Sequence, residues 1–411
     1  MDRRTFCKTL AGATGITLAP LRRSGWAASA PSGNGKRLVV VMLRGAVDGL
    51  SVVVPYGDPS YYRARTAIAI APPGNAGGAL DLDGHFGLHP ALAPLLPLWQ
   101  QGTLAFVHAS GSPDATRSHF DAQDYMESGT PGRKSTPDGW MNRLIGVLPG
   151  PHAPTTAVSL GAVLPRVLSG PNAVANLPAG PSAVRPAALD RPEVSAAFDR
   201  LYAGDDRIAT AYQEGRSARR EMLSDLAEEM QAADNGGAAP AGFPQEAGRL
   251  ATLVRRDANL RLAFVSLGGW DTHVNQGGAQ GQLANHLRPL GEGLAGLAQG
   301  LGPELANTLI VVMSEFGRTV RQNGNGGTDH GHGNAMWVLG GGVAGRRIYG
   351  EWPGLADASL YQGRDLAVTT DFRLVLARAL ERHLRLTDTQ VQAVLPGLPA
   401  GGQALSGLLT A

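Results

Sequence analysis

The chain has 411 residues, a single cysteine and a formal net charge of +2 at pH 7. Because that cysteine, Cys7, lies close to the N-terminus, the rest of the chain has neither disulfides nor thiolate metal ligands. The excess of basic side chains falls within the first 30 residues, so the remainder is slightly acidic. This balance argues against nucleic acid or an anionic membrane as a partner, and no apolar run predicts a stable membrane span.

The first 30 residues have the pattern of an export signal. Arg3 and Arg4 are adjacent, Phe6 follows two places later, and an apolar stretch over 9–21 is too short to cross a bilayer. The pattern predicts a twin-arginine signal peptide over residues 1–30, with cleavage near Ala30. It implies the twin-arginine translocase as a partner and a periplasmic or secreted location.

Continuous apolar runs predict the buried strands of a parallel α/β sheet, in chain order at 38–43, 104–107, 262–265, 309–313 and 335–339. Helical spacing predicts helices over 92–99, 118–127, 283–297 and 371–384, the second with Ser118 as its N-cap. The sequence is broken by Pro and Gly over 129–190, and helical and polar over 192–233. We therefore expect one α/β domain over 36–400, with 129–245 as an insertion or cap.

Acidic and imidazole side chains follow the predicted strands. Ligands of parallel α/β sheets lie at the carboxyl ends of the strands, so we expect these side chains to converge. The candidates are Asp48 after the first strand, Asp271 and His273 after 262–265, Glu315 after 309–313, and the glycine-framed Asp329, His330 and His332.

A cluster of this composition favours divalent cations. Four carboxylates in one cleft would repel each other and raise their own pKa values, and two cations would neutralise them. Oxygen and nitrogen ligands suit zinc or manganese. A structural interpretation remains open for single residues: Asp48 could belong to a turn, and Glu315 could pair with Arg318.

The segments 44–49, 269–273, 314–319 and 328–333 together resemble an uncharacterised family of twin-arginine-exported bacterial proteins. That family is similar to the alkaline phosphatase/sulfatase superfamily. The resemblance covers the chain from about Lys36 to the C-terminal helix. It implies a doubly wound, mostly parallel sheet with helices on both faces and a metal site at the strand ends.

The resemblance also implies roles for individual residues. A nucleophile at a helix N-terminus fits Ser118, with Thr116 as the reserve. The metal ligands would be Asp48, Asp271, His273, Glu315, Asp329 and His330. His332 could complete the site or act as general base. Three arginines could bind the phosphate or sulfate group of the substrate, namely Arg44, Arg117 and Arg318.

These expectations describe an exported metallohydrolase that acts on small anionic esters of phosphate or sulfate. An alternative is an exported binding or assembly protein that keeps the fold, with or without the metal, but has lost catalysis. A phosphotransferase or mutase is a third possibility, although phosphorylated metabolites are scarce outside the cytoplasm. Metal content and turnover of ester substrates separate the first two.

Overall fold

A computed structural model describes residues 35–161, 164–177, 192–201, 208 and 242–410. The predicted signal peptide over 1–30 lies outside these residues, and so does most of the predicted helical stretch 192–233. Within that stretch the structure describes α7 (Pro192–Leu201). Among the described residues, none of the helices combines the length and apolar character that crossing a membrane requires.

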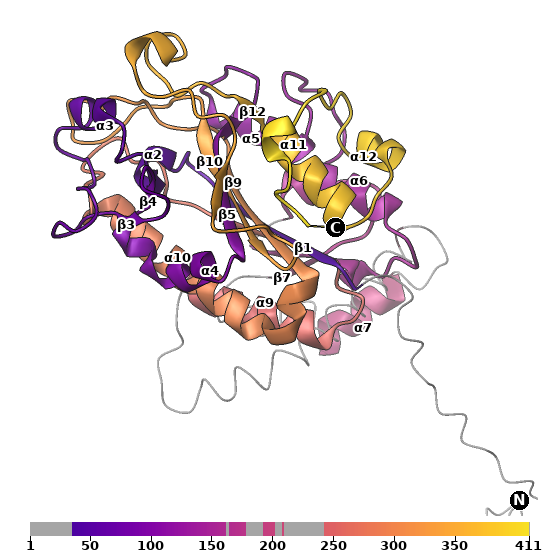
Figure 1. The fold of residues 1–411 in the computed structure, drawn as a ribbon. Helices are drawn as coiled ribbons and strands as arrows, with labels where there is room; N and C mark the ends of the chain where they lie inside the picture. Colours follow the sequence, from indigo (N-terminus) through magenta and orange to yellow (C-terminus); the bar gives the residue numbers. More distant parts are fainter. Residues whose placement is uncertain (1–34, 162–163, 178–191, 202–207, 209–241, 411) are drawn as a thin grey trace, which may run out of the picture. The chain divides into compact units, whose positions relative to one another are not determined.

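A mixed sheet forms the centre of the fold, and nine of its strands lie in the described residues (Figure 1). Its order is β11 (Arg347–Tyr349), β5 (Leu104–Gly111), β10 (Asn334–Gly340), β9 (Thr308–Ser314), β1 (Arg37–Leu43), β8 (Leu262–Leu267), β6 (Ala157–Leu160) and β7 (Ala175–Leu177), with β12 (Thr370–Asp371) also paired to β5. Among the described strands of this central sheet, only β10 runs antiparallel to its neighbours. The predicted mostly parallel sheet is therefore confirmed.

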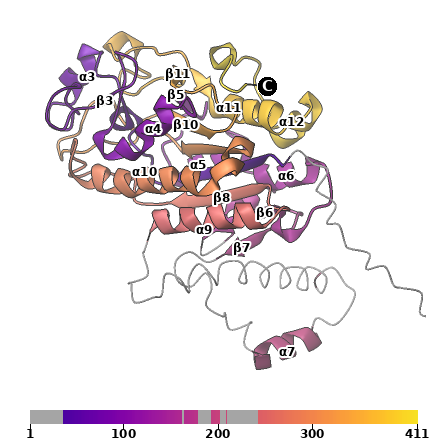
Figure 2. The same ribbon diagram turned by 60° about the horizontal axis from the view of Figure 1, so that its bottom comes forward.

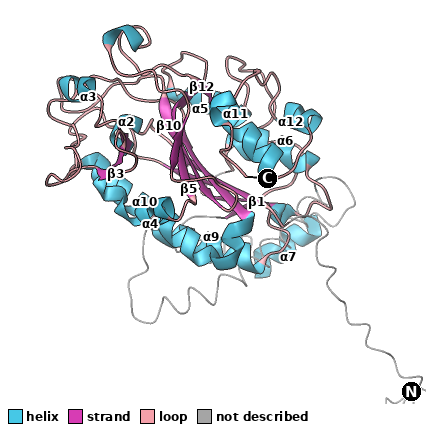
Figure 3. Cartoon of the chain, in the orientation of Figure 1, coloured by secondary structure: helices cyan, strands magenta, loops and turns pink. Residues whose placement is uncertain are grey.

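Helices cover both faces of the sheet (Figures 1 and 3). One face packs on α4 (Leu96–Gln100), α9 (Phe243–Arg256) and α10 (Gln282–Leu301), and the latter two lie side by side (Figure 2). The other face packs on α5 (His119–Ser128), α6 (Trp140–Val147), α11 (Phe372–Arg378) and α12 (Asp388–Val394). Alternation along β1 explains the two layers, because Val39 and Val41 enter the first core while Leu38 and Val40 enter the second.

Smaller elements complete the described fold. They are α2 (Gly49–Val52), α3 (Pro59–Ala64) and a three-stranded sheet of β2 (Val53–Val54), β4 (Gly87–Leu88) and β3 (Leu80–Asp81). Short 3₁₀ turns occupy Pro90–Leu95, Pro154–Thr156, Arg166–Leu168, Gly302–Asn307, Asp357–Ser359 and Gln403–Leu405, and a π-helical turn occupies Ala379–His383. Although β6 and β7 come from the stretch 129–245, they are strands of the central sheet.

Candidate metal centre

The loops that carry the candidate residues leave one edge of the sheet. Strands β8 and β9 both pair with β1 in parallel, so the three strands end at the same edge. Gly45 lets the loop after β1 approach the loop after β8, because its φ is +113° and a Cβ there would lie 2.7 Å from the Asp271 nitrogen. The helix α5, which follows β5, brings its first residue to the same place.

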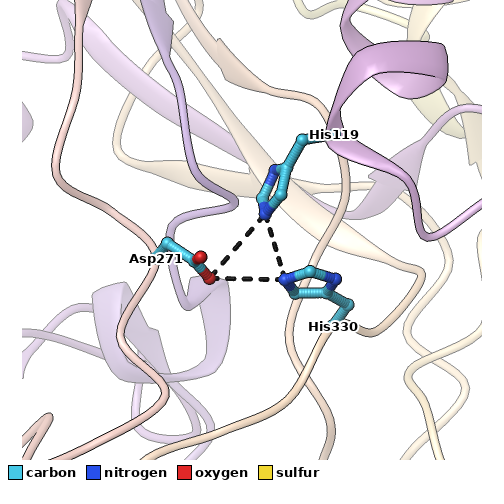
Figure 4. Close-up of side chains that lie close together, drawn as sticks. All are labelled: His119, Asp271 and His330. Atoms are coloured by element: carbon cyan, nitrogen blue, oxygen red, sulfur yellow. Dashed lines mark hydrogen bonds and ion pairs between the residues drawn. The ribbon is translucent and has the colours of Figure 1, made fainter.

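Four side chains converge at this edge. His119 begins α5, Asp271 and His273 follow β8, and His330 lies in the loop between β9 and β10. The Nε2 atoms of His119 and His330 are 3.0 Å apart, and Asp271 Oδ1 lies 3.7 Å and 3.3 Å from them (Figure 4). His273 Nε2 lies 3.0 Å from both His330 Nε2 and Asp271 Oδ1. Three of these four residues, His119, Asp271 and His330, form a group able to hold a metal ion.

Each histidine is held by its other ring nitrogen. His119 Nδ1 lies 2.8 Å from Glu315 Oε1, His273 Nδ1 lies 3.2 Å from Asp329 Oδ1, and His330 Nδ1 lies 2.9 Å from the backbone oxygen of Arg117. All three partners only accept hydrogen bonds, so in the neutral rings the proton sits on Nδ1. The three Nε2 lone pairs then face one another and Asp271, an arrangement that a cation would stabilise.

The charge states of the ligand atoms are tuned by their surroundings. Burial lowers the pKa of His330, and so do the charge of Arg318 and that of His119 whenever the His119 ring is protonated. Burial also pushes the pKa of Asp271 upward, but the hydrogen bond and charge of Arg318 outweigh it and lower that pKa. The hydrogen bond to Glu315 raises the pKa of His119. Metals bind neutral imidazoles and ionised carboxylates, so His330 and Asp271 are poised as ligands.

The donor set fits a divalent metal such as zinc. Ligand atoms arranged tetrahedrally about 2.0–2.1 Å from zinc lie about 3.3 Å apart, close to the separations found here. Carboxylate or carbonyl partners on the far nitrogen of each histidine are the usual outer shell of such sites. The site is also open, since 25% of the His119 and His330 side chains and 46% of Asp271 are exposed. Solvent and small molecules can therefore reach this group of side chains.

Asp48 does not join this group. It is fully buried, and its two carboxylate oxygens accept hydrogen bonds from both terminal nitrogens of Arg65, from Ser51 Oγ and from Gln276 Nε2. Burial alone would raise the pKa of Asp48, but the charge of Arg65 and these hydrogen bonds lower it. The predicted ligand is thus one half of a buried ion pair with Arg65.

Glu315 and Asp329, which were predicted as metal ligands, contact histidines of this group instead. Glu315 Oε1 accepts hydrogen bonds from the Gly45 nitrogen, from Gln123 Nε2 and from His119 Nδ1. Asp329 Oδ1 contacts His273 Nδ1 and accepts from Asn323 Nδ2. Both carboxylates therefore orient a histidine of the metal centre.

The three arginines expected to bind substrate are engaged within the protein. Arg318 is buried and donates to Asp271 and to the backbone oxygens of Gly45, Ala46, Trp270 and Thr328. Arg117 donates to Asp365 and Gln362, and Arg44 donates to Glu127 and Gln123. Arg318 thus ties the loops of the metal centre together, because its donors reach segments after β1, β8 and β9.

Ser118 caps α5, as predicted, and stands directly before His119. Its Oγ accepts from the Asp121 nitrogen at 3.5 Å, and the residue is exposed. The reserve nucleophile Thr116 accepts from the Ser118 nitrogen at 3.2 Å. The buried His332 instead stacks on Tyr361, with ring centroids 4.5 Å apart, so its role as general base stays a prediction.

His119 belongs to the group that could hold a metal ion, but it is not among the residues predicted from the sequence. It belongs to the polar segment after β5, where the prediction from the sequence concerns the hydroxyl of the neighbouring Ser118. The available signal was a histidine in the first turn of a helix that starts at the carboxyl edge of the sheet. Such a residue points toward the same crevice as the loops that follow the parallel strands.

Comparison with known proteins places the chain in a sequence family. The profile of a family described as "Protein of unknown function (DUF1501)" matches residues 89–398. No curated protein matches the sequence.

Several solved structures are similar to the described fold at low identity. A PsFucS1 sulfatase from Pseudoalteromonas sp. is 14% identical, with 82% of this chain and 70% of that chain covered and a TM-score of 0.35. An alkaline phosphatase from the Antarctic bacterium TAB5 is 11% identical, with 76% and 94% covered and a TM-score of 0.29. Ps i-CgsB in complex with k-i-k-neocarrahexaose is 10% identical, with 86% and 73% covered and a TM-score of 0.39. The chemistry of the site therefore has to come from its own residues.

Proposed function

The chain belongs to the DUF1501 family, whose function is unknown, and we propose that it is an exported, metal-dependent hydrolase of phosphate or sulfate esters. The observation that carries this proposal is the convergence of three histidine Nε2 atoms and Asp271 Oδ1 within 3.0–3.7 Å of their neighbours. The adjacent arginines of the twin-arginine pattern, Arg3 and Arg4, support the export part.

His119, Asp271 and His330 would hold the ion, with His273 as a fourth ligand. A bound divalent cation would polarise an ester oxygen and lower the pKa of a nearby hydroxyl or water. The hydrogen bonds from Glu315 and Asp329 keep His119 and His273 oriented, so the ligands need little rearrangement. One ion fits this group, and a second ion per chain remains a prediction.

Ser118 is the proposed nucleophile, because it is exposed and precedes His119 in the chain. Its oxygen would bond to phosphorus or sulfur as the bond to the alcohol oxygen breaks, and the alcohol would take up a proton and leave. Water would then release phosphate or sulfate from Ser118, with His332 as the predicted base. Arg117 already donates hydrogen bonds to Asp365 and Gln362. Groups other than Arg117 would therefore bind the substrate.

The test combines metal analysis with turnover. Protein purified without chelator should contain a divalent metal by elemental mass spectrometry and should hydrolyse chromogenic phosphate or sulfate esters. His330→Ala should lose the metal and the activity together. Ser118→Ala should keep the metal and lose turnover, because the loss of a helix cap costs only about 1 kcal/mol and leaves the fold intact.

Thr116→Ala is the matched control for Ser118→Ala, since it removes a hydroxyl two residues away. Full activity in Ser118→Ala together with loss in Thr116→Ala would transfer the role of nucleophile to Thr116. A metal-free wild-type protein would contradict the proposed site. Bound metal without turnover of any ester would instead favour the exported binding or assembly protein.

A further inference from the structure

A second feature lies beside the metal centre, a pocket of about 540 Å³. Ser159 and Leu160 of β6 and Ser266 of β8 form part of its wall, at the carboxyl ends of these parallel strands. Ligands of α/β sheets bind at this edge, and pockets for small molecules commonly measure roughly 300–1,000 Å³.

The helix α5 joins the pocket to the metal centre. It presents Phe120, Gln123, Asp124 and Glu127 to the pocket, whereas its first residue, His119, belongs to the metal centre. Gln123 Nε2 donates to the same Glu315 oxygen that His119 Nδ1 contacts, at 2.9 Å and 2.8 Å respectively. Glu315 therefore links a residue that lines the pocket with a residue of the candidate metal centre.

The charges that line the pocket cancel. Two arginines and two acids line it, and they are paired: Arg44 with Glu127 at 2.6 Å and Arg166 with Asp124 at 3.0 Å. Because each guanidinium already faces a carboxylate, the described residues that line the pocket offer an anion no unpaired positive charge. This neutrality distinguishes it from the binding site of a phosphate or sulfate group, which would need an uncompensated cation.

What the pocket does offer suits a ligand with both hydroxyl groups and an apolar face. Ser159, Ser266 and the planar ends of the paired side chains provide hydrogen-bond donors and acceptors. Phe120, which is 90% exposed, provides a flat apolar surface at the pocket. An apolar ligand face that packs on this ring would be removed from water.

We propose that this pocket binds a neutral sugar unit, with the C–H face of the ring on Phe120 and the hydroxyl groups on the paired side chains and serines. The inference rests on the proposed function in one respect: the sugar would be the alcohol part of the ester whose phosphate or sulfate lies at the metal centre. The binding itself requires neither metal nor turnover.

The test measures binding of neutral saccharides to the full chain by ligand-observed NMR and calorimetry. The probes are maltose, cellobiose, lactose and neutral agaro-oligosaccharides, with inorganic phosphate and sulfate as anionic arms. At least one saccharide should bind, and Phe120→Ala should weaken its Kd at least about tenfold, whereas Phe120→Trp should keep the affinity because it keeps the apolar face. Leu201→Ala is the control, since Leu201 is exposed to 70% but does not line the pocket.

Two results would overturn the inference: binding of none of the saccharides, or saccharide binding that Phe120→Ala leaves unchanged. Anion binding that is lost in Arg44→Ala would also overturn it, because it would show that the pocket is an anion site. The outcome is separable from that of the hydrolase proposal. Saccharide binding that depends on Phe120 would support the sugar pocket even if no ester is hydrolysed. Ester hydrolysis without saccharide binding, unchanged in Phe120→Ala, would support only the hydrolase proposal.

Discussion

The position of a proton on each histidine ring decides what the ring can do at this site. The partners of the Nδ1 atoms of His119, His273 and His330 are two carboxylates and a backbone carbonyl, which are all acceptors. The inward Nε2 atoms consequently present lone pairs, the form in which imidazole binds metals. Glu315 and Asp329 therefore contribute to the site through the histidines that they orient.

A substitution of Asp48 tests whether this residue supports the fold or binds metal. Asp48→Asn should lower the free energy of unfolding by about 3–5 kcal/mol, because it leaves the buried Arg65 charge without its partner. Urea unfolding measures the change. Arg65→Met and the double variant complete the cycle, and the double variant should be less destabilised than the sum of the two single changes. Metal loss at unchanged stability would contradict this expectation.

The sequence predicts that the candidate residues lie at one edge of the sheet, but it does not predict which contacts each of them makes. Asp271, His273 and His330 were among the candidates because they follow buried strands or lie between glycines, and strand ends can be located from sequence. The ion pair of Asp48 could not be predicted in the same way. Its partner Arg65 lies in the irregular stretch after α3, where neither spacing nor periodicity indicates which acid it meets.

At the scale of elements, the candidate metal centre depends on two loops that are hydrogen-bonded to each other. The backbone of the loop after β8 pairs with the loop before β10, through bonds from Asn275 to Asn325 and from Gln276 to Gly326. Gln276 Oε1 accepts hydrogen bonds from Thr272 Oγ1 at 2.9 Å and Thr328 Oγ1 at 2.8 Å. Each threonine is adjacent to a residue of the site, so this buried amide fixes the spacing between the two sets of ligands.

Thr328→Val should therefore weaken metal binding without a change in any ligand. Valine keeps the shape of threonine but removes the hydroxyl that donates to Gln276, and we expect about a tenfold higher zinc Kd in competition with a chelator. Thr328→Ser should restore the affinity, since it keeps the hydroxyl. Thr308→Val is the control, because the hydroxyl of this buried threonine donates to the Glu304 backbone oxygen instead. Equal losses in both valine variants would contradict a specific role for the Thr328 hydroxyl.

Element type was predictable where the hydrophobic pattern was long. The predicted strand at 309–313 is β9 (Thr308–Ser314), and the predicted helix at 283–297 is the core of α10. The predicted helices do not include α9, although Pro244 occupies its first turn, where proline is favoured. The antiparallel direction of β10 was also not predictable, since a buried strand has the same apolar run in either direction.

For the whole molecule, three buried histidines couple stability to pH. Burial lowers the pKa of His89, His108 and His383 to about 4, from the value of 6.5 that the unfolded chain retains. Between these pH values the unfolded chain takes up protons that the folded protein does not. The free energy of unfolding contributed by these groups is therefore complete above about pH 6.5 and is lost as the pH falls toward 4.

His108→Gln tests this coupling. Each such histidine should lower the free energy of unfolding by about 2 kcal/mol as the pH falls from 6.5 to 5. Because the variant lacks one of them, its free energy of unfolding should fall by about 2 kcal/mol less than that of the wild type. Urea unfolding at both pH values gives the comparison. Glutamine can still donate to the Val53 oxygen that His108 contacts, which limits other effects of the change. Equal losses in the two proteins would show that His108 does not stay neutral in the folded state.

The antiparallel strand β10 lies between β9 and β5, although it follows β5 by more than two hundred positions in the chain. Synthesis therefore completes β5 long before β10, and β9 shortly before it. A polypeptide interrupted ahead of Asn334 would leave β5 without its partners β10, β11 and β12 and would leave one edge of β9 unpaired, and such edges recruit strands from other molecules. Truncated products of this gene should consequently accumulate as aggregates rather than as soluble fragments.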